Sequence, residues 1–183
     1  MGLLSIIRKQ NKKDKIIDVL ILGLDNSGKT TITKRMFNED VDSVSPTVGF
    51  QITPFEYGGY SLSIWDVGGQ TTLRAFWGGF YDSTDVVLWV IDGLSTERLE
   101  ESFSQLNEKI VQQDRLAGIY LLVVINKCDL IPEDKREPLK QSVSRALKLQ
   151  ERLDDDHWHL SLVSGKTGEG VDELLKWVVS RDY

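Results

Sequence analysis

Hydrophobic residues in this chain form short continuous runs that alternate with longer segments of helical periodicity. Strands are predicted at 16–23, 51–57, 60–65, 86–91, 120–125 and around 160–163. The runs at 86–91 and 120–125 are apolar throughout, as expected of strands buried on both faces. Gly58-Gly59 lies between the strands at 51–57 and 60–65. It predicts a two-residue hairpin turn, because glycine accepts the positive φ angles required there.

Apolar residues spaced three or four apart predict helices between the strands. A first helix is expected over 29–37, and three more are marked by the sets Leu99/Phe103/Leu106/Ile110, Leu139/Val143/Ala146/Leu147 and Val171/Leu174/Leu175/Val178. Strands that alternate with helices predict an α/β fold with a mostly parallel six-stranded sheet, helices on both faces and one antiparallel hairpin strand. Ligands of such sheets bind at the carboxyl ends of the strands.

The loop after the first strand fits the phosphate-binding pattern G-x-x-x-x-G-K-[ST] and lies between a strand and a helix. Its backbone N–H groups and the helix N-terminus attract phosphate. Lys29 is predicted to contact the β- and γ-phosphates, and Thr30 to ligate Mg²⁺. The predicted nucleotide-binding residues are Gly23, Leu24, Asp25, Asn26, Ser27, Gly28, Lys29, Thr30 and Thr31. The alternative is a glycine-containing turn that happens to precede a helix.

Two short motifs indicate guanine as the base. Asn126-Lys127-Cys128-Asp129 follows a predicted strand, and the Asp129 carboxylate can accept hydrogen bonds from guanine N1–H and N2–H₂, a donor pair that adenine lacks. Lys127 can pack over the base and Asn126 can brace the loop. The backbone of Ser164-Gly165-Lys166 can face the guanine carbonyl. The alternatives are a polar turn and a Ser/Gly turn, respectively.

Residues that would sense the γ-phosphate follow the strand at 60–65. Asp66 is predicted to hold Mg²⁺ through water, Gly69 to offer its N–H to the γ-phosphate, and Gln70 to orient the attacking water. Thr47 lies in the polar loop after the first helix and can donate its hydroxyl group to Mg²⁺. The alternative for Gln70 is an ordinary exposed glutamine, and for Thr47 an ordinary loop threonine.

Composition narrows the function further. The 183 residues suit one domain, and no apolar run reaches the roughly 20 residues of a membrane span. One cysteine cannot form an internal disulfide, and no secretory signal is visible, so we expect a cytoplasmic protein. The net charge of −6 argues against nucleic-acid binding. Segment 1–15 nevertheless has a net charge of +4, which leaves a net charge of −10 on residues 16–183. We expect membrane contact through this basic segment to be weak at most.

The motifs GLDNSGKTT, SPTVGF, WDVGGQ, NKCD and SGKTGEG together resemble the small GTPases, and among them the ADP-ribosylation-factor (Arf) family. The opening MGLLSIIRKQ is most similar to the Arf-like subtype that works with tubulin-folding cofactors in microtubule biogenesis. The resemblance implies a P-loop NTPase fold, GTP/GDP and Mg²⁺ as cofactors, and slow hydrolysis without an activating protein. It also implies a monomer that meets an exchange factor and effectors, and possible association with the cytoskeleton.

The same resemblance assigns parts of the chain to the nucleotide switch. Segment 1–15 would be an amphipathic, basic extension of a G domain at 16–183, and the switches would lie at about 40–50 and 68–81 with a hairpin between them that shifts register. Phe50, Trp65 and Phe80 match effector-contacting positions; the alternative for them is core packing. Gly2 is a weak candidate for acylation because Ile6 stands where acylated relatives carry Ser or Thr.

Two departures from the family pattern affect the second switch. Gly78-Gly79 replaces an arginine and a polar residue, which should loosen this segment, and Phe80 replaces a frequent tyrosine. Alternatives to a tubulin-related switch are an Arf-type GTPase of vesicle traffic, a non-cycling guanine-nucleotide scaffold and a small-molecule phosphotransferase. His157 and His159 are expected to be surface histidines rather than metal ligands.

Overall fold

The computed structural model describes residues 6, 10, 11, 13–111 and 118–183. Its centre is a six-stranded sheet in the order β2-β3-β1-β4-β5-β6, parallel except for the β2–β3 pair. The strands are β1 (Ile16–Leu22), β2 (Phe50–Tyr57), β3 (Tyr60–Val67), β4 (Val86–Asp92), β5 (Tyr120–Asn126) and β6 (Trp158–Leu162). The predicted α/β architecture, including its single antiparallel hairpin, is confirmed.

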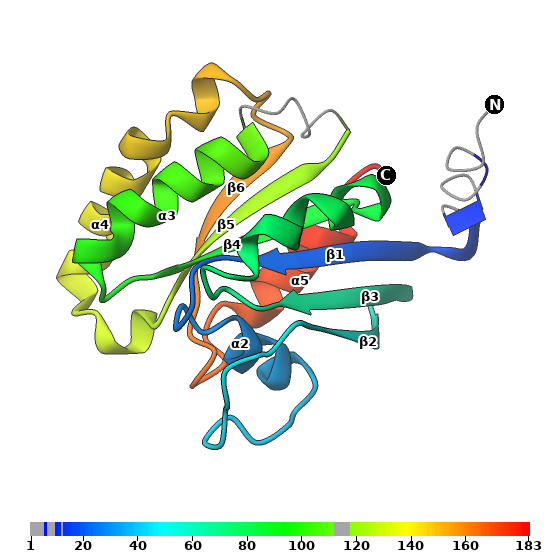
Figure 1. Ribbon diagram of the computed structural model, residues 1–183, viewed down its shortest axis with the longest axis horizontal. Coiled ribbons are helices and arrows are strands. Elements are labelled where there is room, and N and C mark those ends of the chain that lie inside the picture. The colour runs from blue at the N-terminus through cyan, green and yellow to red at the C-terminus, as the bar shows by residue number, and fades with distance from the viewer. Residues whose placement is uncertain (1–5, 7–9, 12, 112–117) are drawn as a thin grey trace.

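Helices cover both faces of the sheet (Figure 1). They are α2 (Lys29–Met36), the 3₁₀ segment η1 (Arg74–Ser83), α3 (Leu99–Leu106), α4 (Glu133–Leu147) and α5 (Val171–Val179). Alternation along β1 shows why two layers are needed: Leu20 and Leu22 pack in the core under η1, α3 and α4, whereas Val19 and Ile21 pack in the core under α2 and α5. Among the described residues no helix is long and apolar enough to cross a membrane.

Several elements differ in length from the predicted ones. β3 continues to Val67 because Phe50 pairs with Val67 at the base of the hairpin, so Asp66 lies inside the strand rather than after it. The helix marked by Leu99 is α-helical only as far as Leu106 and continues as a π-helical turn, Asn107–Val111. α4 begins six residues before Leu139, and its Pro138 falls in the second turn.

The strand ends gather the sequence motifs at one edge of the sheet. The phosphate-binding loop follows β1, the Gly68-Gly69 loop follows β3, and the Asn126 motif follows β5. The loop that begins at Ser164 follows β6. Four motifs separated by up to about 140 residues in sequence therefore lie at the carboxyl ends of neighbouring or nearby strands, where a parallel sheet binds its ligand.

Candidate functional site

The loop between β1 and α2 adopts the conformation of an anion cradle. Gly23 and Gly28 have φ angles of 147° and 91°, and Asn26 is also left-handed at 62°. A Cβ atom on Gly23 would stand 2.3 Å from the Val90 carbonyl oxygen, so no other residue fits there. These conformations let successive N–H groups turn toward one point at the start of α2.

Lys29 lies within this loop and is only 6% exposed. Its Nζ donates to the carbonyl oxygens of Gly23 and Leu24, at 3.0 and 2.9 Å. Burial lowers the pKa of Lys29 to about 8, although the nearby Asp66 carboxylate opposes that shift. A buried cation that is held next to backbone N–H groups suits a polyphosphate ligand.

Thr30, Thr47 and Asp66 come together from three different segments. Thr30 Oγ1 is 2.7 Å from Thr47 Oγ1, and it donates to Asp66 Oδ2, also at 2.7 Å. Burial raises the pKa of Asp66, whose carboxylate is 2% exposed. Within the part of the chain that the structure describes, the buried Asp66 Oδ1 has no hydrogen-bond partner.

This donor set fits Mg²⁺. Two hydroxyl groups and a carboxylate are hard oxygen ligands, and Mg²⁺ characteristically takes few protein ligands and completes its shell with water and phosphate oxygens. An orphaned, buried carboxylate oxygen is costly unless a cation or water meets it. No group of three His, Cys, Asp or Glu side chains among the described residues could hold a metal ion, and His157 and His159 form no such group.

A cavity of about 300 Å³ joins these residues to both predicted switches. It is lined by Asp25, Asn26, Gly28, Lys29, Thr30, Thr31, Val44, Ser45, Pro46, Thr47, Gly68, Gly69 and Gln70. Gly69 packs tightly on the phosphate loop: its carbonyl oxygen accepts from Asp25 N at 3.1 Å, and a Cβ on it would stand 2.4 Å from Gly23 O. The Gln70 side chain is exposed on the wall of this cavity.

Asn126 braces the site, as its position in the sequence predicts. Its Nδ2 donates to Ser27 O at 2.9 Å, and its Oδ1 accepts from Gly165 N at 3.0 Å. Asn126 is 2% exposed, so both bonds are made away from water. It therefore joins the phosphate loop to the loop after β6.

The predicted base-reading residues lie around this brace. Lys127 has a left-handed φ of 68° and donates to Asn26 O at 3.0 Å and to Asp92 Oδ2 at 2.6 Å. Ser164, which is fully buried, donates to Asp129 Oδ1 at 2.6 Å. Asp129 and the backbone of Gly165 are thus held in fixed positions beside Asn126.

Lys166 takes a different position from the rest of its motif. Its ammonium group pairs with Asp42 in the first predicted switch, and the side chain is 59% exposed. The backbone of this loop is held by α2 instead: Arg35 Nε donates to Gly165 O at 3.1 Å.

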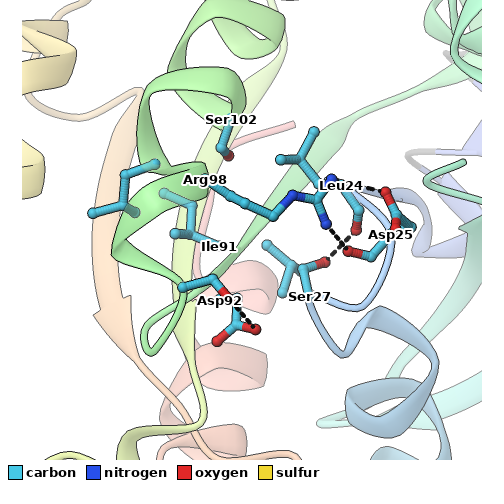
Figure 2. A pocket seen from close by; sticks show the side chains of 10 residues that line it. Leu24, Asp25, Ser27, Ile91, Asp92, Arg98 and Ser102 are labelled. Carbon is cyan, nitrogen blue, oxygen red and sulfur yellow. Dashed lines mark hydrogen bonds and ion pairs between the residues drawn. The ribbon is translucent and has the colours of Figure 1, made fainter. Parts of the chain in front are cut away.

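An ion-pair network beside the phosphate loop was not expected from the sequence. Arg98, at the start of α3, reaches across a small pocket to Asp25, as Figure 2 shows, with its Nη2 2.9 Å from Asp25 Oδ1. Arg74 contacts the same carboxylate at 3.3 Å, and both arginines bind Glu101. Hydrogen bonds from Arg98 lower the pKa of Asp25, and those from Arg74, then Arg98, lower that of Glu101. The i,i+3 spacing of Arg98 and Glu101 was the only sequence signal.

The three aromatic residues that match effector positions form one cluster. Ring centroids of Phe50, Trp65 and Phe80 lie 5.3 to 6.1 Å apart. Phe50 is 52% exposed, whereas Trp65 and Phe80 are partly buried, so the cluster is a surface feature and not simply core packing. Gly2 lies outside the described residues, as does most of segment 1–15.

Cys128, within the base-reading motif, is buried. Burial raises the pKa of its thiol to about 11, which keeps it protonated and unreactive at neutral pH.

Comparisons with known proteins agree with this geometry. The profile of the ADP-ribosylation factor family matches residues 3–181. ADP-ribosylation factor-like protein 2 of Dictyostelium discoideum is 41% identical over 179 residues, which cover 98% of this chain and 94% of that protein. ADP-ribosylation factor-like protein alp41 of Schizosaccharomyces pombe is 42% identical over 180 residues, with the same coverage.

A solved structure shares the fold. The Arl6 BBS3 small GTPase from Trypanosoma brucei, with bound nucleotide analogue GppNp, has a TM-score of 0.75 and 27% sequence identity, and the match covers 89% of this chain and 95% of that one. The family match over residues 3–181 spans the phosphate loop and both predicted switch segments. The chain therefore belongs to the ADP-ribosylation factor family and is an Arf-like small GTPase, a class of GTP-binding switches that in general hydrolyse GTP.

Proposed function

We propose that this chain is a magnesium-dependent switch that binds GTP through the residues described above and hydrolyses it slowly to GDP. The observation that carries the proposal is the meeting of Thr47 and Asp66 at Thr30 Oγ1, each at 2.7 Å. Thr47 belongs to the first switch and Asp66 to the strand that leads into the second. A γ-phosphate with its metal ion would stabilise the contact of Thr47 and Asp66 with the phosphate loop.

Mg²⁺ would be held by Thr30 and Thr47, with Asp66 acting through water. When bound, the ion neutralises charge on the phosphate oxygens. The chain supplies the rest: Lys29 provides a buried positive charge, the loop from Gly23 to Gly28 provides N–H donors, and Gln70 lines the same cavity and can orient a water molecule.

Slow intrinsic hydrolysis is expected because the nearby arginines already donate hydrogen bonds to other groups of the protein. Among the described residues, Arg74 and Arg98 lie beside the phosphate loop, and each donates to carboxylates and to backbone carbonyl oxygens. Neither is therefore free to stabilise charge on a transferring phosphoryl group. A partner that supplies an arginine should accelerate hydrolysis by roughly 10³–10⁵-fold.

The test combines binding with single-turnover hydrolysis. Calorimetry with Mg²⁺ should show tight binding of GTP and GDP and at least 100-fold weaker binding of ATP, by the donor mismatch at Asp129. Gln70→Leu should keep GTP affinity while abolishing most of the hydrolysis stimulated by an activating protein. Equal affinity for ATP, or unchanged stimulated hydrolysis in Gln70→Leu, would contradict the proposal.

We further propose that the effectors include tubulin-folding cofactors. The support is the similarity of the opening MGLLSIIRKQ to that Arf-like subtype, together with relatives named ADP-ribosylation factor-like protein 2. Capture of partners from lysate with GDP-loaded and GppNp-loaded protein tests this. Recovery of tubulin cofactors in a nucleotide-dependent manner supports it, and exclusive recovery of vesicle-coat proteins favours a role in traffic.

A further inference from the structure

Two buried side chains of η1 hold the two peptide groups of the Gly68-Gly69 loop. Trp77 Nε1 donates to Gly68 O at 3.2 Å, and Arg74 Nε donates to Gly69 O at 3.0 Å. Trp77 is fully buried and Arg74 is 6% exposed. Both donors therefore act in a region from which water is largely excluded, where a hydrogen bond to a carbonyl oxygen orients a peptide most effectively.

The orientation of these peptides decides where their N–H groups point. None of the described peptide bonds is cis, so each N–H is directed opposite to the carbonyl oxygen of the same peptide. Trp77 thereby orients the N–H of Gly69, the predicted γ-phosphate donor. Arg74, together with Asp25 N, which donates to the same Gly69 carbonyl oxygen at 3.1 Å, orients the peptide that carries the N–H of Gln70, and with it the starting direction of the glutamine side chain.

Arg74 is itself fixed by partners outside the second switch. Its Nη1 donates to Glu101 Oε1 of α3 at 2.8 Å, and its Nη2 lies 3.3 Å from Asp25 Oδ1 in the phosphate loop. The planar guanidinium group presents several donors in a rigid fork, so these contacts also fix the direction of Nε toward Gly69. One side chain thus joins the phosphate loop, the second switch and α3.

We propose that Arg74 is a positioning residue that holds the Gly69–Gln70 peptide on the phosphate loop and so favours the triphosphate over the diphosphate state. This inference rests on the proposed function. It assigns Arg74 an effect on GTP and on hydrolysis, and little effect on GDP, because only the γ-phosphate and the attacking water meet the Gly69–Gln70 segment.

Arg98 provides a matched control. It contacts the same Asp25 and Glu101 carboxylates, but within the described part of the chain its hydrogen bonds go to Asp25 and Glu101 and not to Gly69 or Gln70. Loss of Arg98 disrupts the same network and can weaken both nucleotides, yet should leave the ratio of their affinities unchanged. A merely structural role for Arg74 would give its variants the same behaviour as those of Arg98.

The experiment uses the full chain and the variants Arg74→Lys, Arg74→Gln, Arg98→Lys and Arg98→Gln. For each, affinities for GppNp and GDP, the single-turnover rate of GTP hydrolysis and the melting temperature of the GDP form are measured. We expect both Arg74 variants to lower the GppNp/GDP affinity ratio and the hydrolysis rate about tenfold, with GDP affinity within threefold of wild type. The Arg98 variants should keep the ratio within threefold.

Two results would overturn the inference. The first is that the Arg74 variants keep both the GppNp/GDP affinity ratio and the hydrolysis rate within threefold of wild type. The second is that the affinity ratio falls equally in the Arg98 variants. Should Arg74→Gln fail to fold, Arg74→Lys decides, because lysine keeps the charge but cannot donate from a fork to Gly69 and Glu101 together. Wild-type binding is measured first. Its absence contradicts the proposed function, whereas normal wild-type binding with unaltered Arg74 variants contradicts only the role of Arg74.

Discussion

Asn126 lies directly against Gly28: a Cβ atom on Gly28 would stand 2.1 Å from Asn126 Nδ2. The contact lets the amide reach Ser27 O on one side and Gly165 N on the other. Asn126→Ala would leave both of these buried backbone groups without partners, at about 1–3 kcal/mol each. We expect GDP and GppNp to dissociate about 10- to 100-fold faster, measured by release of fluorescent analogues.

Asn107→Ala is the control for this substitution. Asn107 accepts an exposed hydrogen bond from Arg152 far from the cavity, so its removal should change release rates by less than twofold. Unchanged release in Asn126→Ala would show that the brace has no role in retaining the nucleotide.

Asp129→Asn should change the preferred base. The aspartate can accept from two guanine donors, whereas an asparagine offers one donor and one acceptor, which suits the N1–H and C2 carbonyl of xanthine. The Ser164 hydroxyl bonds Asp129 Oδ1 at 2.6 Å, and it can equally bond an amide oxygen there, so the loop should keep its shape. We expect XDP to compete at least 100-fold better against labelled GDP than it does in wild type. Retained preference for GDP would place base selection elsewhere.

Much of the site was predictable because its residues act through local motifs. The loop from Gly23 to Thr30 is contiguous, and its strand–loop–helix context follows from the hydrophobic pattern. Asn126, Asp129 and Ser164 lie just beyond apolar runs, so their placement at one edge of the sheet follows from the parallel fold alone.

Arg74 and Arg98 could not be predicted in the same way. Their partner Asp25 lies 49 and 73 residues away in sequence, and no spacing rule selects that carboxylate over others. The side chains reach it because η1 and α3 begin beside the phosphate loop, a relationship that appears only when the sheet is assembled. The same applies to Lys166, whose pairing with Asp42 depends on the path of the first switch.

Lys29 should take up a proton when nucleotide binds. Its pKa of about 8 in the protein alone reflects burial, and a diphosphate beside it should raise that value well above 9. At pH 8.5 about three-quarters of a proton should be taken up per GDP, and at pH 7 only about a tenth, because Lys29 is then already charged. Calorimetry in buffers of different ionisation enthalpy measures both values.

The same lysine should affect the stability of the nucleotide-free chain. Between pH 8 and 10.5 the unfolded chain binds the Lys29 proton while the folded chain does not, so this group makes stability rise with pH over that window. Lys29→Met should remove the Lys29 contribution to this pH dependence of stability. In the calorimetry of GDP binding, equal proton uptake at pH 7 and pH 8.5 would contradict the lowered pKa of Lys29.

Alanine substitutions at Gly79 and Gly59 test the effect of backbone conformation alone, because both positions have room for a Cβ atom but differ in φ. A Cβ atom on either glycine would meet nothing within 4 Å, but Gly59 has a φ of +81°, whereas Gly79 lies in η1 outside the positive-φ region. Gly79→Ala should therefore stabilise the GDP form by about 0.5–1 kcal/mol, raising its melting temperature by about 2 °C. Gly59→Ala should destabilise it by a similar amount, since alanine is strained in the left-handed region. If Gly79→Ala leaves the melting temperature unchanged or lowers it, Gly79 does not loosen the second switch; if Gly59→Ala fails to lower it, the positive φ at Gly59 is not the cause of the difference.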